Sequence, residues 1–260
     1  NHEDYHLKLI KRKKIPSGAL PKKDFNSTYA VSELESFCDW LQRKGPFTAI
    51  VDGANVLYHG HGEVHYSQIQ HVVKKLEEMN EKPLIVMPEK YARRRIHIRY
   101  DYVQILDEKS AEYLERLEQE HADMIYKVPS KVLDDYYWMI ASVVGDKLSD
   151  VNADESPDRF PGCRPMLITN DQMRDHKLEL LEPRQFRRWY SCHIVNYRLS
   201  PFSDEDEWGS REVNFSAADV FSNEIQGNQL HETTKSTGSL VWHLPVREWD
   251  KYDRLCIRLV

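Results

Sequence analysis

Two carboxylates in the segment 167–181, LITNDQMRDHKLELL, stand where one predicted element ends and the next begins. Asp171 and Asp175 are four residues apart and follow the apolar run 164–170, which is typical of a buried strand. Four residues make about one helical turn, so a strand that turns into a helix here would direct both side chains out of the carboxyl end of a sheet. Carboxylates in that position predict a site for a positively charged group.

Three more acids are predicted at the same edge of the sheet. Asp52 closes the apolar run in FTAIVDGANV (47–56), and Asp134 and Asp135 open the predicted helix 132–145. Taken singly, each acid also fits an ordinary structural role, such as an Asp-Gly turn, a helix N-cap or a charge in the first helical turn. Taken together, they would repel one another unless a cation offsets their charge. The set therefore favours a cation site.

The ligand chemistry of this cluster favours a hard divalent ion. Its donors are carboxylate oxygens, which suit Mg²⁺ or Mn²⁺ better than Zn²⁺. An acidic pocket of this kind, with two ions, is typical of phosphodiester hydrolysis, in which the ions generate hydroxide and stabilise the leaving oxygen. A phosphatase would use similar chemistry, but it would be expected to carry D-x-D at its first strand, and VDGAN lacks that motif.

Strands and helices are predicted to alternate along most of the chain. After the first strand, helices are expected at 66–80, 110–121, 132–145 and 183–190, and strands at 82–88, 122–129, 164–170 and 192–198. This alternation is typical of right-handed crossovers and a mostly parallel sheet. The acidic segment 146–162 is predicted to be a surface insertion, and from about residue 199 the chain becomes polar and strand-like.

Composition limits the class of protein. The chain has 260 residues, of which 40% are hydrophobic, so it can form a packed core. No apolar run approaches the ~20 residues needed to cross a bilayer. Four scattered cysteines favour a reducing compartment over a disulfide framework. The net charge of −6 argues weakly against general polyanion binding, and the N-terminus, without an initiator Met or a signal-peptide core, is expected to lie inside a longer protein.

Four segments, in this order, resemble the metallonuclease (NYN/PIN-like) domain of protein-only ribonuclease P: IVDGANV (50–56), LDDYYWMIA (133–141), LITNDQMRDH (167–176) and VWHLP (241–245). Many PIN-like nucleases carry Asp-Gly-x-Asn, whereas N-D-x-M-R-D-H with a downstream W-H-x-P is more specific. The resemblance implies an α/β fold, with a Rossmann-type, mostly parallel sheet flanked by helices and a small β-rich C-terminal region. It divides the chain into a basic linker (1–32), the metallonuclease domain (33–198) and a C-terminal extension (199–260).

The resemblance implies Mg²⁺-dependent endonucleolytic removal of the 5′ leader from precursor tRNA, with a 5′ phosphate on the tRNA and a 3′ hydroxyl on the leader. The metal-site residues carried over by motif are Asp52, Asp134, Asp135 and Asp171, with Asp175 in support. Asn55 is expected to orient Asp52 or a bound water. Arg174 and His176 flank Asp175. Each has either a local structural role or a contact with the substrate or the metal site.

A structural zinc site is a further implication. His243 and Cys256 match the second half of the family's zinc site, but the first half, a C-x-x-C pair before residue 33, is absent. That half either lies upstream or has been lost, and His2 and His6 are weak substitutes. Two ligands do not make a tetrahedral site. The alternative is that His243 and Cys256 pack the C-terminal hairpin.

A basic block after the second predicted strand is the candidate RNA contact: Lys90, Arg93, Arg94, Arg95 and Arg99. A solvated helix face would look the same, but an acidic centre needs flanking positive charge to hold phosphates. In this family a pentatricopeptide-repeat region grips the tRNA, and this chain shows no such repeat. The expected compartment is the mitochondrion, ahead of the nucleus or plastid.

Two rival functions remain at the level of sequence. One is an NYN-type ribonuclease that degrades mRNA or stem-loop RNA. The WHLP segment and the Met-Arg-Asp-His motif distinguish this chain from such enzymes. The other is an inactive RNA-binding module that retains the fold. The presence of every expected acid argues against that second reading.

Overall fold

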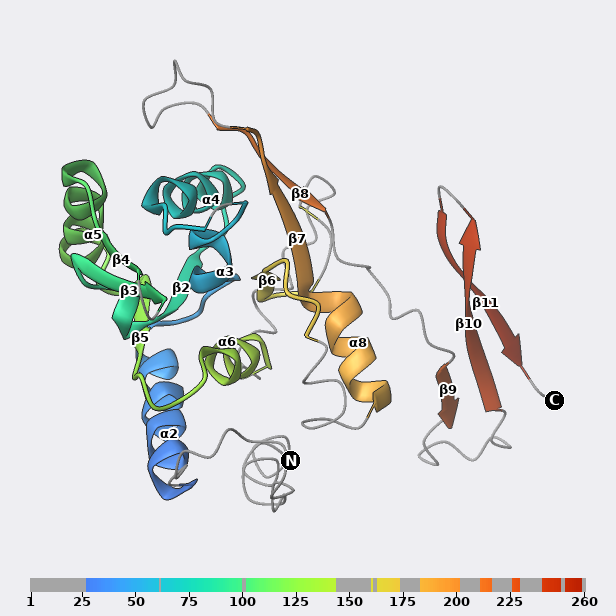
Figure 1. Cartoon of the computed structure of the whole chain (residues 1–260). Coiled ribbons are helices and arrows are strands. Elements are labelled where there is room, and N and C mark those ends of the chain that lie inside the picture. The colour runs from blue at the N-terminus through green and yellow to red at the C-terminus, as the bar shows by residue number, and fades with distance from the viewer. Residues whose placement is uncertain are drawn as a thin grey trace.

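A six-stranded sheet forms the centre of the computed structural model, which describes residues 27–60, 62–99, 102–143, 160, 163–173, 183–201, 211–216, 226–229, 240–248 and 251–258 (Figure 1). The strand order is β5–β2–β1–β6–β7–β8. In that order the strands are Ile125–Val128, Pro83–Pro88, Ala49–Asp52, Met166–Ile168, Ile194–Leu199 and Val213–Ser216. The first five are parallel and β8 is antiparallel to β7. The predicted mostly parallel α/β sheet is confirmed.

Helices cover both faces of this sheet. One face packs against α2 (Ser27–Lys44), α6 (Asp134–Val143) and α8 (Pro183–His193), and the other against α4 (Tyr66–Glu78) and α5 (Glu108–Glu120). The alternation of side chains along β1 divides them between two cores. Ala49 and Val51 join the α4 and α5 side, whereas Ile50 joins the side of α2 and α6. Burial on both faces explains why these strands are almost wholly apolar.

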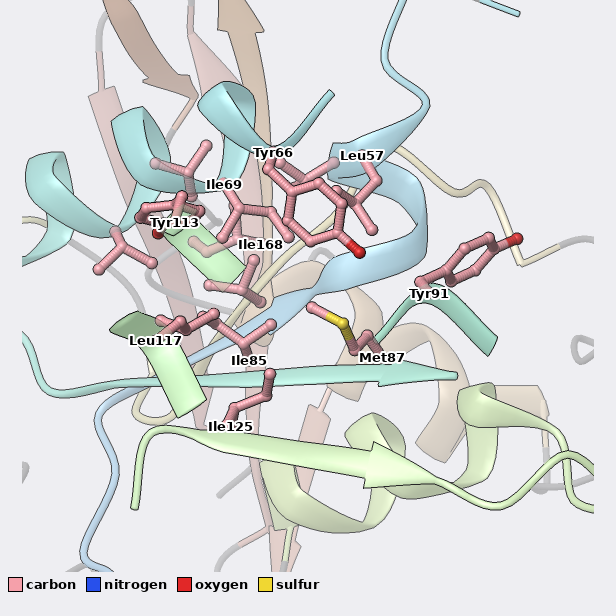
Figure 2. Close-up of a cluster of buried hydrophobic side chains, with 14 of the residues drawn as sticks. Leu57, Tyr66, Ile69, Ile85, Met87, Tyr91, Tyr113, Leu117, Ile125 and Ile168 are labelled. Carbon is pink, nitrogen blue, oxygen red and sulfur yellow. The ribbon is translucent and has the colours of Figure 1, made fainter. Parts of the chain in front are cut away.

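Figure 2 shows the core on the α4 and α5 side. Ile69 from α4 and Leu117 from α5 lie with Ile85 of β2 and Ile125 of β5, and all four are buried. This core fixes β2 beside β1, and with it the positions of the residues that follow each strand.

The sheet has a topological switch point between β1 and β6. From β1 the chain moves to β2 and then β5 on one side, and it later returns to β6 on the other side of β1. Crossover connections therefore leave in opposite directions at the carboxyl ends of β1 and β6. In open α/β sheets ligands bind in the crevice that forms at such a point.

The Asp-Gly pair starts a short helix that the sequence pattern did not predict, although Asp52 was correctly expected to close the strand. β1 ends at Asp52, and α3 (Gly53–Leu57) begins at the next residue. A Cβ at Gly53 would lie 2.8 Å from the Cβ of Met87 and 2.9 Å from the carbonyl oxygen of Val86. Glycine is thus required because α3 starts in close contact with β2. Five residues are too few for helical periodicity to be visible in the sequence.

Several described elements fall outside the predicted pattern. The helix α2 spans the expected domain boundary at residue 33, and β8 extends the sheet beyond residue 198. A two-stranded hairpin, β3 (Arg95–Arg99) and β4 (Tyr102–Ile105), follows the 3₁₀ turn η1 (Glu89–Tyr91). None of the described helices is long and apolar enough to span a bilayer. The expected insertion at 146–162 lies outside the described residues, apart from residue 160.

The strand-like C-terminal region forms a second sheet. It consists of β9 (Gln226–Gln229), β10 (Leu240–Glu248) and β11 (Lys251–Arg258), with antiparallel pairing in the order β11–β10–β9. In Figure 1 this sheet lies apart from the six-stranded sheet. Its register places His243 directly opposite Cys256.

Candidate functional site

Asp52 lies at the switch point with both carboxylate oxygens held. It is the last residue of β1 and the N-cap of α3, and only 5% of its surface is exposed. Its Oδ1 accepts a hydrogen bond from the backbone N–H of Asn55 at 3.1 Å. Its Oδ2 accepts one from the hydroxyl of Thr169 at 2.8 Å. The carboxylate is therefore fixed in orientation by the first turn of α3 and by Thr169, which directly follows β6.

Asp171 lies beyond the end of β6 in a turn and not in a helix. Its Oδ1 accepts from the backbone N–H of Met173 at 2.8 Å, and its own N–H donates to the Thr169 hydroxyl at 3.1 Å. Met173 has a φ of 49°. The described part of this segment is thus a side-chain turn, which offers the backbone an alternative to helical hydrogen bonds. The residues in which the expected helix would continue lie outside the described ones. Asp175 lies outside the described residues, as do Arg174 and His176.

The acids at the switch point share one electrostatic environment. The pKa of Asp52 is raised to about 7, chiefly by burial and also by the charges of Asp134 and Asp135, while the hydrogen bonds from Asn55 and Thr169 oppose the shift. The pKa of Asp134 is raised to about 6, chiefly by burial and also by the charges of Asp135 and Asp171, while the charge of Lys90 opposes the shift. Asp134 and Asp135 form the first turn of α6. The fold thus brings four of the five predicted acids to one edge of the sheet.

Thr169 and Tyr197 are parts of this site that sequence reasoning missed. Thr169 is fully buried. Its hydroxyl links the two acids that follow β1 and β6, since it donates to the carboxylate of Asp52 and accepts from the backbone N–H of Asp171. The hydroxyl of Tyr197, from β7, donates to Oδ1 of Asn55 at 2.9 Å. Asn55 itself contacts Asp52 through its backbone N–H and not through its side chain. The Thr-Asn-Asp sequence at a strand end was the available signal for Thr169.

The donor set fits a hard divalent ion, although the described residues do not by themselves form a closed cage. Within the parts of the chain that the structure describes, no three His, Cys, Asp or Glu side chains lie close enough together to hold a metal ion. Mg²⁺ keeps several waters and is bound through one or two carboxylates, so it does not require such a cage. Burial, and to a smaller extent repulsion between the acids, raises the pKa of Asp52 and of Asp134, and a bound cation would offset both effects.

The basic block lies at the carboxyl end of β2, but its members differ in environment. Arg93 pairs with Glu89 at 2.8 Å and Arg94 with Glu115 at 2.7 Å, and all these side chains are exposed. Lys90 lies over the ring of Tyr91, with its Nζ 4.7 Å from the ring centre, and its charge lowers the pKa of Asp134. Arg95 and Arg99 begin and end β3. The block is a turn followed by a strand, so it is not a helix face.

The two residues expected to form half of a zinc site lie on adjacent strands. His243 and Cys256 are paired across β10 and β11, and the Cys256 side chain is exposed. No third Cys, His or acidic ligand joins them among the described residues. His2 and His6 fall outside those residues.

The stability of the metal-free chain should fall as the pH rises from about 4 to about 7. The folded-state pKa of Asp52, about 7, lies above its ordinary value of 3.8, so the folded state binds more protons across this range. Above pH 7 the effect is complete. The variant Asp52→Asn should lack this pH dependence. Between pH 5 and pH 8 its free energy of unfolding should therefore rise by roughly 2–4 kcal/mol relative to that of wild type, at about 1.4 kcal/mol per pKa unit.

Urea denaturation of both proteins in EDTA, at pH 5 and pH 8, measures this difference. Titrating groups remote from residue 52 cancel between wild type and variant, whereas Asp134 and Asp135, whose charges act on Asp52, contribute to the same difference. Equal pH dependence of the stability of the two proteins would contradict the raised pKa of a buried Asp52.

Comparisons with known proteins point to one family. The family model described as protein-only RNase P matches residues 7–255. Proteinaceous RNase P 2 of Arabidopsis thaliana is 32% identical over 209 residues, which cover 73% of this chain and 34% of that protein. Proteinaceous RNase P 1, chloroplastic/mitochondrial, of the same plant is 27% identical over 172 residues, covering 65% of this chain and 25% of that protein.

A solved structure agrees. The crystal structure of nuclear proteinaceous RNase P 2 from A. thaliana aligns with a TM-score of 0.53 and 25% identity, over 89% of this chain and 41% of that one. The chain spans between a quarter and about a third of the length of these two curated relatives.

Proposed function

Because this chain belongs to the protein-only RNase P family, we propose that it is a metal-dependent endoribonuclease that removes the 5′ leader from precursor tRNA. The tRNA would carry a 5′ phosphate and the leader a 3′ hydroxyl. The observation that carries this proposal is the gathering of Asp52, Asp134, Asp135 and Asp171 at the switch point, on the segments that resemble the family. Asp175 completes the proposed set from outside the described residues.

The acids have two different roles in this proposal. Asp52 presents a carboxylate whose direction is set by Asn55 and Thr169. Asp134, Asp135 and Asp171 add negative charge around it, so that Mg²⁺ or Mn²⁺, with two ions in the proposed arrangement, is bound there. When bound, the ion lowers the pKa of water and offsets charge on the leaving 3′ oxygen. The set reads no base, so the position of the cut depends on how the folded RNA is held.

The partner and the place of action follow from the same family membership. We propose that precursor tRNA is the substrate and that a pentatricopeptide-repeat region, which the resemblance to the family implies, holds it. The relatives bear organellar and nuclear names, so the proposed site of action is the mitochondrion, nucleus or plastid. His243 and Cys256 are proposed as half of a zinc site whose other ligands are not among the described residues.

Incubation of the purified chain with 5′-labelled precursor tRNA, with and without Mg²⁺, tests this function. We expect a single cut at the leader junction, only with the ion, and no cut in an unstructured RNA of equal length. Scattered cuts in both RNAs would instead identify an NYN-type ribonuclease that degrades mRNA or stem-loop RNA. Binding without any cut would identify an inactive RNA-binding module.

The basic block should supply RNA affinity and not chemistry. Replacing Lys90 and Arg95 with Gln should lower the slope of binding affinity against salt by roughly one unit per lost phosphate contact. The single-turnover rate at saturating RNA should barely change. Lys75→Gln is the matched control, because Lys75 is an exposed lysine in the last turn of α4. An unaltered salt slope would mean that the block only faces solvent.

A further inference from the structure

The side-chain amide of Asn55 is held in one orientation. Its Oδ1 accepts from the backbone N–H of Asn170 and from the hydroxyl of Tyr197, both at 2.9 Å. A backbone N–H can only donate, so the amide atom that faces it must be the oxygen. The Tyr197 hydroxyl must therefore donate to the same oxygen. With respect to the described residues, the Nδ2 group is the part of this amide that is available to a ligand.

Tyr197 is fixed well enough to hold that amide. Only 1% of its surface is exposed, and its ring packs against the ring of His59 with centres 4.9 Å apart. The side chain of Asn170 accepts from the Tyr197 N–H at 3.1 Å and donates to its carbonyl oxygen at 2.9 Å. These two bonds continue the pairing of β6 with β7 beyond the last residue of β6. The hydroxyl consequently has little freedom to move.

Asn55 lies between the acids of the site. Its backbone N–H donates to the Asp52 carboxylate, and its Oδ1 accepts from the N–H of Asn170, the residue before Asp171. The side chain is partly exposed, and Nδ2 makes no hydrogen bond within the described residues. The neighbouring carboxylates repel a phosphate, whereas a neutral N–H group donates to its oxygens at no cost in charge. Asn55 thus offers a neutral hydrogen-bond donor beside carboxylates that can only accept.

We propose that Asn55 donates from Nδ2 to a non-bridging oxygen of the scissile phosphodiester, and that Tyr197 is a positioning residue that keeps the amide in this orientation. The inference rests on the proposed function and assigns the substrate group that meets this side of the site. It also assigns the role of Asn55 to its nitrogen, since Oδ1 is already engaged by two donors.

Two substitutions separate these roles. Asn55→Asp keeps an oxygen for Asn170 and Tyr197 but replaces the N–H group with a second acceptor, so the single-turnover rate at saturating precursor tRNA should fall by about 100-fold. Tyr197→Phe should lower that rate by about tenfold, because Asn170 still holds the amide. RNA affinity and Mn²⁺ affinity of the RNA-free protein should stay unchanged in Tyr197→Phe. Tyr66→Phe, which removes the hydroxyl from another fully buried tyrosine, should leave the rate unchanged.

A double-mutant cycle decides whether Tyr197 acts through Asn55. In an Asn55→Ala background, Tyr197→Phe should cause no further loss of rate. A full tenfold loss in that background, or a wild-type rate in Tyr197→Phe or Asn55→Asp, would overturn the inference while leaving the proposed function in place. If wild type itself removes no leader, the proposed function fails and the inference fails with it.

Discussion

The variant Asp52→Asn should lose leader removal by roughly 10³-fold or more, about 4 kcal/mol of transition-state stabilisation, while it keeps its fold. Asn retains an oxygen for the Asn55 N–H and remains a good N-cap for α3. The Thr169 hydroxyl can accept from the new amide as well as donate to the old carboxylate. What is lost is the negative charge at the switch point. The same loss is expected for Asp171→Asn, whose Oδ1 contact to Met173 is retained.

Single-turnover cleavage with saturating Mg²⁺ measures the loss, and the urea midpoint checks the fold. Asp107→Asn is a matched control, because Asp107 also caps a helix and accepts from the Ser110 N–H at 2.7 Å. It should cleave at the wild-type rate. Full activity in Asp52→Asn with Mg²⁺ present would remove this residue from the site.

The variant Arg164→Met should show the second large effect, a decrease in the free energy of unfolding of about 3–5 kcal/mol. Arg164 donates from Nε to Glu81 at 3.0 Å and from Nη2 to the carbonyl oxygen of Phe160 at 2.8 Å. The side chains of Arg164 and Glu81 are 2% and 1% exposed. Glu81 precedes β2 and Arg164 precedes β6, at the edge of the sheet opposite the acids. Loss of the arginine would leave a buried carboxylate without its cation.

Urea denaturation measures this effect, and the double variant Glu81→Met with Arg164→Met is its control. Removal of both charges should recover much of the lost stability, because the penalty comes from the unpaired partner. A loss below about 1 kcal/mol in the single variant would show that the pair contributes little to the fold.

Local pattern was sufficient for the central elements of the fold. Strands such as β2 and β7 are apolar runs between turn residues, and helices such as α4 show apolar residues at helical spacing. The hairpin β3–β4 was missed because its basic residues resemble a solvated helix face, although Ile96 and Ile98 alternate with charged or polar residues as in a strand. The helix α3 was missed because it is one turn long.

The acids of the site could be predicted from the sequence, whereas the residues that hydrogen-bond to them could not. Asp52, Asp134 and Asp171 were predicted because each stands at the end of a strand or the start of a helix. The bond from Thr169 to Asp52 joins residues 117 positions apart, and the bond from Tyr197 to Asn55 joins residues 142 apart. No local periodicity encodes such pairs. The ion pairs of Arg93 and Arg94 likewise depend on the packing of the turn, so the sequence overstated the uniformity of the basic block.

End-group analysis of the two fragments of a precursor tRNA tests the central claim most directly. If the acid site activates water against the phosphodiester, the tRNA carries a 5′ phosphate and the leader a free 3′ hydroxyl. We expect the wild-type chain to produce these ends at one position, the leader junction, and to give no other cleavage product. A cyclic phosphate on the leader would show attack by the RNA's own 2′ hydroxyl, and it would contradict the assignment of these carboxylates as the hydrolytic centre.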